Sequence, residues 1–304
     1  MGMLWVEDEE EEEDNSGRVK GGVMTKRILI TGGGGYIGTE LHRYLTAEWF
    51  DYDVDICDYE EVHSGDLPLA EHLRSEDIEK YNGIVHLAAL SGIIPCQESP
   101  EKAVRRNLLT AMNVFMEAAK FRIPCIFTSS QAAKTPTTSS YALQKRMCEL
   151  MAEDLNKKGA LITVFRMTNI YGGDQYLERK NTVIKKFVDS YFLDEPLRID
   201  GDGTQERDFL HVDDVCVFIE RALNNPVVSY PIDIGTGVGT SINEIAMMFD
   251  EDYPVIHSEG SRTIGVDSSI ADPELALQEF NYQAYPRMAE YIGQMKYVKE
   301  NKTV

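Results

Sequence analysis

The sequence predicts an α/β fold in which a doubly wound parallel sheet is followed by a smaller C-terminal lobe. Three observations indicate this fold. The apolar segment Arg27–Thr31 runs directly into four consecutive glycines. From there to residue 170, short apolar segments alternate with segments of helical periodicity, whereas the rest of the chain is richer in turns. Such alternation is typical of a parallel sheet that helices cover on both faces.

The predicted strands are short apolar runs, as expected for strands that are buried on both faces. They lie at 27–31, 54–57, 83–87, 125–128 and 161–166. The predicted helices repeat apolar residues at intervals of three and four. They follow the glycines from Ile37 onward and cover 104–119 and 141–155.

Turns rich in glycine, asparagine and proline become frequent after residue 171. We therefore expect a disordered acidic tail at 1–24, a dinucleotide-binding domain at 25–170 and a substrate-binding lobe at 171–304. The apolar segments 212–223 and 232–234 allow a second interpretation, in which they join the sheet of the first domain.

The composition argues against several classes of protein. The chain has 51 acidic and 30 basic residues, a net charge of −21, which leaves no basic surface for nucleic acid. Residues 7–14 are all acidic and should be disordered. No signal peptide is evident and no apolar run approaches the ~18 residues of a membrane span, so no membrane partner is expected. Five scattered cysteines indicate free thiols in a reducing cytoplasm and no metal site.

Glycines 32, 35 and 38 form a G-x-x-G-x-x-G pattern between a predicted strand and a predicted helix. Residues without side chains let the backbone approach a pyrophosphate, and the free N–H groups of the helix favour an anion there. Asp58 closes the second strand, where a carboxylate accepts hydrogen bonds from ribose hydroxyls and repels a 2′-phosphate. The pattern therefore favours NAD over NADP, with Asp55 as a second candidate for the ribose contact.

Tyr141 and Lys145 are one helical turn apart and therefore share a face of the predicted helix. A free tyrosine, with a pKa of about 10, is a poor base at neutral pH, and a nearby ammonium group favours the phenolate. The serine pair 129–130 ends the preceding strand. A phenol, an ammonium group, a serine hydroxyl and a dinucleotide together suit hydride transfer at an alcohol carbon.

These motifs resemble the extended short-chain dehydrogenase/reductase family, and in particular its NAD-dependent nucleotide-sugar epimerase/dehydratase branch. The resemblance extends from about residue 26 to residue 282. It includes the Rossmann cofactor loop at 31–38, His86-Leu87-Ala88-Ala89 beside the cofactor, and the Tyr141-x-x-x-Lys145 pair. The most specific part is 201–214, which is similar to a signature of sugar-nucleotide epimerases and dehydratases.

The resemblance implies a role for each motif residue. Tyr141 is the implied acid/base, Lys145 lowers its pKa, and Ser130 orients the sugar hydroxyl. The implied cofactor contacts are Gly32, Gly35, Tyr36, Ile37, Gly38, Asp58, Asp66, Leu67, Leu87, Ala88, Ala89, Asn107, Tyr141 and Lys145. A nucleotide-diphosphate sugar is the implied substrate, and its implied contacts are Ser130, Asn169, Asn181, Arg207 and Arg262. A homodimer is also implied.

The segment between Ser130 and Tyr141 departs from the family pattern because it is short and lacks the usual Tyr-Gly. Gln131 and Ala132 stand where the family's dehydratases and decarboxylases carry acidic residues. An epimerase needs only the tyrosine, so we favour 4-epimerisation through a transient 4-keto sugar. The alternatives are a nucleotide-sugar reductase, a dehydratase or decarboxylase, and a non-catalytic NAD-binding regulator. Lys134 is either a solvated lysine or a contact for an acidic sugar or a phosphate.

Overall fold

The computed structural model describes residues 19–20, 23–58, 78–173, 182–250, 252–258 and 268–302. Most of the predicted acidic tail at 1–24 lies outside these ranges, and its described residues form the antiparallel pair β1 (Val19–Lys20) and β2 (Val23–Met24). Among the described residues, no helix has both the length and the apolar character that a membrane span requires. The same residues contain no cluster of side chains suited to holding a metal ion.

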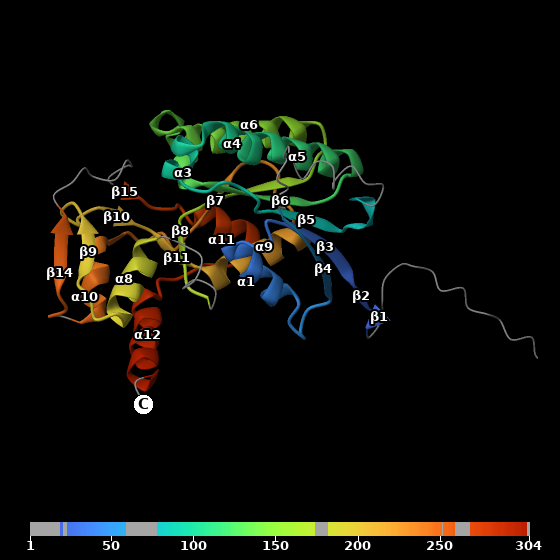
Figure 1. Cartoon of the computed structure of the whole chain (residues 1–304). Coiled ribbons are helices and arrows are strands. Elements are labelled where there is room, and N and C mark those ends of the chain that lie inside the picture. The colour runs from blue at the N-terminus through green and yellow to red at the C-terminus, as the bar shows by residue number, and fades with distance from the viewer. Residues whose placement is uncertain are drawn as a thin grey trace, which may run out of the picture.

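A six-stranded parallel sheet forms the centre of the fold (Figure 1). Its strands, in spatial order, are β12 (Ile232–Ile234), β7 (Ile162–Met167), β6 (Cys125–Ser130), β5 (Gly83–His86), β3 (Lys26–Thr31) and β4 (Tyr52–Cys57). The order reverses at β3, which pairs with β4 on one side and with β5 on the other. The predicted doubly wound α/β fold is therefore confirmed, and ligands of such sheets bind outside the carboxyl ends of the strands near this reversal.

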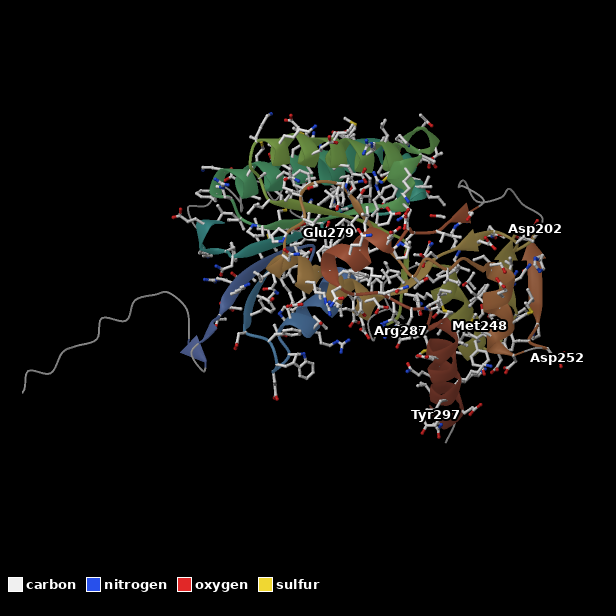
Figure 2. All side chains as sticks on the ribbon, turned by 180° about the vertical axis from the view of Figure 1, so that it is seen from behind. Asp202, Met248, Asp252, Glu279, Arg287 and Tyr297 are labelled. Atoms are coloured by element: carbon white, nitrogen blue, oxygen red, sulfur yellow. The ribbon has the colours of Figure 1, made fainter. Side chains whose placement is uncertain are left out.

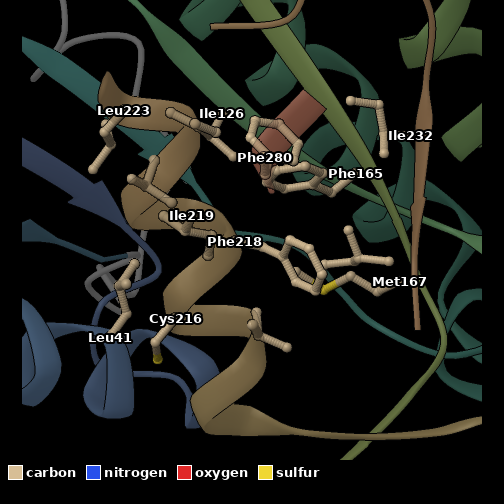
Figure 3. Close-up of a cluster of buried hydrophobic side chains, with 14 of the residues drawn as sticks. Leu41, Ile126, Phe165, Met167, Cys216, Phe218, Ile219, Leu223, Ile232 and Phe280 are labelled. Carbon is tan, nitrogen blue, oxygen red and sulfur yellow. The ribbon is translucent and has the colours of Figure 1, made fainter. Parts of the chain in front are cut away.

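Helices cover both faces of the sheet (Figure 1). One face carries α3 (Ile93–Glu98), α4 (Pro100–Ala103), the π-helical turn Val104–Leu109, α5 (Thr110–Phe121) and α6 (Ser140–Lys157). The other face carries α1 (Tyr36–Leu45), α9 (Val212–Asn224) and α11 (Glu274–Phe280). Alternate residues of β3 enter opposite cores: Leu29 packs with residues of α5 and α6, whereas Ile28 and Ile30 pack with residues of α1 and α9. Figure 3 shows the second of these cores, with Phe218 of α9 facing the sheet.

The remaining elements build a smaller lobe around a core of its own. Its helices are α8 (Val183–Phe192), α10 (Ile242–Phe249) and α12 (Met288–Lys302). Its strands are β8 (Asn169–Tyr171) paired with β11 (Phe209–His211), β9 (Leu197–Asp200) paired with β14 (Val255–Ser258), and a small sheet of β10 (Glu206–Arg207), β13 (Thr240–Ser241) and β15 (Ser268–Ser269). Figure 2 shows α12 projecting from this lobe, with Tyr297 near its end.

Two segments from beyond residue 171 belong to the sheet rather than to the small lobe. β12 pairs with β7 in parallel, and α9 packs against the sheet through Phe218 and its neighbours. These are the segments 212–223 and 232–234, for which the sequence allowed a place either in the small lobe or in the sheet. The chain therefore crosses between the two parts more than once, and the domain boundary near residue 170 stays a prediction.

His86, the last residue of β5, has a pKa well below that of a free histidine. Its side chain is buried, and its Nδ1 lies 2.7 Å from Oγ1 of Thr31. Burial, together with the Lys145 ammonium, lowers the pKa of His86 to about 3. An unfolded chain has a histidine pKa of about 6.5, so between these values the unfolded state binds one more proton than the folded state.

We therefore expect His86 to make the free energy of unfolding fall by about 1.4 kcal/mol for each pH unit below about 6.5. Urea unfolding between about pH 7 and pH 4.5 measures this slope. His86→Gln should lose stability less steeply than the parent chain on acidification. His257→Gln, at an exposed histidine on β14, is the matched control, and equal slopes for His86→Gln and the parent would contradict the assignment.

Candidate active site

A cavity of about 490 Å³ lies at the carboxyl ends of β3, β5, β6 and β7, where the strand order reverses. Most of the site residues predicted from the sequence lie on its wall. These are Gly32, Gly35, Tyr36, Ile37, Gly38, Asp58, Leu87, Ala88, Ala89, Ser130, Tyr141, Lys145 and Asn169. The cavity is therefore the candidate active site.

The glycine loop forms one wall of this pocket. Gly32 has a φ of +78°, and a Cβ atom at Gly38 would lie 2.3 Å from the carbonyl oxygen of Gly32. Both positions therefore require glycine. Gly35 precedes α1 and has no side chain with which to cap the first N–H groups of that helix. Because the start of α1 lines the pocket, an anionic group there would satisfy these donors.

Asp58 follows β4 and lines the same part of the pocket. Its carboxylate accepts a hydrogen bond of 2.5 Å from the backbone N–H of Gly34, so it lies over the glycine loop. Asp55, the second candidate for the ribose contact, is instead bound to the Arg27 guanidinium and the Tyr81 hydroxyl (2.7 Å) and does not line the pocket. The geometry favours Asp58 for the ribose contact.

Tyr141 lies in the first turn of α6. Ser139 caps this helix by accepting a hydrogen bond of 3.1 Å from the N–H of Ala142. Ser130 is the last residue of β6, so the end of the strand and the start of the helix bring the two hydroxyl groups together. Burial raises the pKa of Tyr141 to about 12, and the hydrogen bond with Ser130 acts in the opposite direction.

Lys145 lies one turn beyond Tyr141 on α6 and is buried. Its ammonium donates a hydrogen bond of 2.6 Å to the carbonyl oxygen of Thr128 and lies 5.9 Å from the centroid of the Tyr141 ring. Burial lowers the pKa of Lys145 to about 8. Burial of the phenol dominates the pKa of Tyr141 in the protein alone, where the ammonium is bound to Thr128, so a lowering of this pKa by Lys145 stays a prediction.

Asn107 is not part of the pocket wall. The first six residues of the helix predicted at 104–119 form the π-helical turn Val104–Leu109, in which the Asn107 side chain is buried. Its amide oxygen accepts from the N–H of Leu90 (2.7 Å), and its Nδ2 donates to the Leu90 carbonyl (3.1 Å) and to Oε1 of Gln144 (2.8 Å). Asn107 therefore holds the loop that follows β5 against α6.

The predicted substrate contacts are brought together only in part. Asn169 lines the pocket, whereas Arg207 does not, and the Arg207 guanidinium donates a hydrogen bond to the Glu206 carbonyl oxygen (2.7 Å). The other predicted site residues lie outside the described ranges: Asp66, Leu67, Asn181 and Arg262.

The sequence pattern of the NAD-dependent epimerase/dehydratase family matches residues 28–235. The chain belongs to this family. Its curated relatives include a UDP-N-acetyl-alpha-D-glucosaminuronate decarboxylase of Bacillus cytotoxicus, 28% identical over 73% of this chain and 79% of the relative. A putative UDP-glucose 4-epimerase of Methanocaldococcus jannaschii is 29% identical over 72% of this chain and 79% of the relative.

The fold agrees with solved structures. The UDP-glucose 4-epimerase of Thermotoga maritima, determined with UDP-glucose, has a TM-score of 0.77 and 22% identity, covering 91% of this chain and 99% of that chain. The resemblance to NAD-dependent nucleotide-sugar epimerases and dehydratases is thereby confirmed at the level of the family.

NAD is the cofactor of this family, and the described residues fit it. A Cβ atom at Gly32 would lie 2.6 Å from the backbone N of Ala88, so only a glycine lets the loop pack this closely against the segment that follows β5. The uncapped start of α1 offers donors to that pyrophosphate. Asp58 stands beside the loop as an acceptor for ribose hydroxyls.

Part of the pocket wall was not predicted from the sequence. The additional lining residues are Ser91, Thr128, Ser129, Met167, Thr168, Ile170, Thr182, Val183, Ile184 and Phe209. Several of them adjoin predicted site residues along a strand, so extending each motif by one or two positions would have found them. Phe209 lies within the signature at 201–214, two positions from Arg207, and it is placed near the pocket by the pairing of β11 with β8.

Behind the site, the buried carboxylate of Glu149 fixes α6 to the sheet. Its Oε1 accepts hydrogen bonds from Ser129 Oγ (2.7 Å) and Arg166 Nε (2.8 Å). Its Oε2 accepts from Arg166 (2.6 Å) and Arg146 (2.9 Å). Burial alone would raise the pKa of Glu149, but the hydrogen bonds from Arg166 and Ser129 outweigh it and lower that pKa.

Proposed function

We propose that this protein is a nucleotide-sugar 4-epimerase that retains NAD and acts through a transient 4-keto sugar. The observation that carries the proposal is the grouping of Ser130, Tyr141 and Lys145 on the pocket wall. Among the described lining residues, the other titratable groups are Tyr36 and Asp58, which belong to the cofactor loop and its neighbour. The described wall thus offers one acid–base group, which is what an epimerase needs.

The cofactor, when bound, supplies the hydride acceptor and donor. Tyr141 takes the proton from the C4 hydroxyl of the sugar and later returns a proton to the same oxygen. Ser130 holds that oxygen by a hydrogen bond. Because the pKa of Tyr141 is about 12 in the protein alone, where Lys145 is already present, its ionisation needs further positive charge, and we assign this charge to the oxidised nicotinamide.

The substrate in this proposal is a nucleotide-diphosphate sugar, as the printed names of the relatives suggest. Thr182 is a further candidate contact for the diphosphate, because it lies on the pocket wall at the start of α8. Its side chain caps this helix by accepting a hydrogen bond of 3.5 Å from the N–H of Lys185. Asn169 lies on the same wall. Arg207, Asn181 and Arg262 stay predicted contacts of the diphosphate.

Gln131 favours epimerisation over elimination or decarboxylation. Its Nε2 donates a hydrogen bond of 3.1 Å to the Arg166 carbonyl oxygen, and the side chain does not line the pocket. The position therefore supplies neither an acid nor a base to a bound sugar. The relatives include both a decarboxylase and an epimerase at similar identity, so their names do not choose between the reactions.

One experiment separates the candidate reactions. The protein is denatured, the released cofactor is identified by mass, and UDP-, GDP-, CDP- and dTDP-sugars are then screened by NMR. We expect an epimeric sugar with no net change in absorbance at 340 nm. Stoichiometric oxidation of NADH would indicate a reductase, and loss of water or carbon dioxide would indicate a lyase. NAD binding without turnover of any nucleotide sugar would indicate a regulator.

Asp58→Ala should reduce the preference for NAD over NADP by about tenfold, because it removes a ribose acceptor and a charge that repels a 2′-phosphate. Dissociation constants of both cofactors, measured by calorimetry, test this. Asp53→Ala is the matched control, because Asp53 lies on β4, the strand that precedes Asp58, and its side chain is 62% exposed. An unchanged preference in Asp58→Ala would assign the selectivity to another residue.

A homodimer and a cytoplasmic location complete the proposal. The outer faces of α5 and α6 expose Met116 (56%), Leu143 (49%) and Leu150 (48%), a face suited to a second copy. All five cysteines are unpaired, which suits a reducing compartment.

Leu150→Glu should halve the mass measured by light scattering, whereas Met247→Glu, on α10, should not. A monomeric parent would contradict the dimer.

A further inference from the structure

The short segment between Ser130 and Tyr141 is held by local hydrogen bonds, such as those from the N–H groups of Thr135 and Thr138 to the carbonyl oxygens of Ala132 and Thr135. It consists of two single 3₁₀ turns, η3 (Gln131–Lys134) and η4 (Pro136–Thr138), which are weaker than α-helical turns. Gln131 and Ala133 are buried, but most of the other residues are exposed. Ser130 ends β6 and Tyr141 lies in the first turn of α6, so this segment joins the two elements that carry the hydroxyl groups.

Lys134 ties this segment to the edge of the sheet. Its ammonium forms an ion pair with Asp233 of β12 and does not line the pocket, so Lys134 is an exposed lysine, as one interpretation of the sequence had it, but one with a fixed partner. The Asp233 side chain is only 7% exposed, whereas that of Lys134 is 40% exposed. Asp233 also accepts a hydrogen bond of 3.2 Å from the N–H of Asp272. A carboxylate this buried requires partners of this kind.

The ion pair is one end of a row of alternating charges. Asp233 lies opposite Arg166 in the pairing of β12 with β7, and Arg166 binds Glu149 through two nitrogens. Glu149 lies on α6, the helix that begins with Tyr141. The row therefore runs from η3 across β12 and β7 to α6.

We propose that Lys134 and Asp233 are positioning residues, whose ion pair holds η3 against β12 and so sets the approach of Ser130 to Tyr141. Neither side chain lines the pocket, so both act through the segment rather than on the substrate. The inference rests on the proposed function. Because the Lys134 side of the pair is exposed, removal of both charges together should affect stability little. A displacement of about 1 Å in the reacting groups, however, lowers turnover as much as a hundredfold.

The double variant Lys134→Met/Asp233→Asn tests the proposal, because it removes both charges and leaves no buried carboxylate without a partner. We expect kcat to fall by about tenfold or more, with the substrate KM, the NAD dissociation constant and the Tm close to those of the parent. Lys134→Arg keeps the ion pair and should restore most of kcat. Hydrogen–deuterium exchange should rise in residues 131–140 of the double variant and stay at the parent level in β3.

Two outcomes would overturn the proposal. One is a double variant with parent-like kcat and parent-like exchange at 131–140. The other is a fall in kcat that accompanies an equal loss of Tm and NAD binding, because the ion pair would then serve stability alone. The exchange measurement needs no substrate, so it tests the positioning even if no nucleotide sugar is turned over, in which case the proposed function alone would fail.

Discussion

Tyr141→Phe should lower kcat by about 10²- to 10⁴-fold while NAD binding stays within a few-fold of the parent value. The substitution removes only the hydroxyl that exchanges a proton with the sugar, and the ring stays in place on the pocket wall. Steady-state turnover of the nucleotide sugar found in the screen gives kcat. Calorimetric titration with NAD gives the dissociation constant.

The matched control for this variant is Tyr297→Phe. Tyr297 is 67% exposed and lies near the end of α12, far from the sheet (Figure 2). Its variant should be indistinguishable from the parent in both measurements. Parent-like turnover in Tyr141→Phe would remove the tyrosine from the mechanism, and loss of NAD binding in the same variant would mean that the phenol serves the cofactor site instead.

Glu149→Ala should lower the free energy of unfolding by about 3–5 kcal/mol. The variant leaves the Arg166 guanidinium, whose side chain is only 16% exposed, without its carboxylate partner. It also removes an acceptor from the Ser129 hydroxyl. Equilibrium unfolding in urea at neutral pH measures the change.

Glu153→Ala is the control, since Glu153 lies one turn further along α6 and its exposed carboxylate pairs with Lys157. Such exposed pairs add little stability, so this variant should unfold close to the parent. If the two glutamate variants lost equal stability, the contact of α6 with the sheet would not depend on the buried carboxylate.

Much of the fold could be predicted because the strands of the sheet are continuous apolar runs with helical periodicity between them. The glycine loop was also predictable, since its constraint is local: a positive φ at Gly32 and a close approach at Gly38 are properties of a few neighbouring residues. The π-helical turn at 104–109 was not, because the same apolar spacing suits an uninterrupted α-helix.

Contacts between distant segments account for what the sequence did not reveal. Nothing near Lys134 in the sequence indicates that Asp233 is its partner, because the sheet alone brings them together. Likewise, the spacing of Tyr141 and Lys145 predicted a shared helix face but not the binding of the ammonium by the Thr128 carbonyl. Burial, which sets the pKa of the phenol, is a property of the assembled pocket.

The edge strand β12 has a consequence for how the protein is made. During synthesis, β7 leaves the ribosome well before residues 232–234 do. Until β12 is made, the edge of β7 at Phe165 and Met167, which later pairs with β12, has no neighbouring strand. Contacts between residues so far apart in sequence form late and slow the folding reaction. Chains truncated before β12 should therefore aggregate during synthesis, and chaperones that shield unpaired strands should raise the yield of the full-length protein.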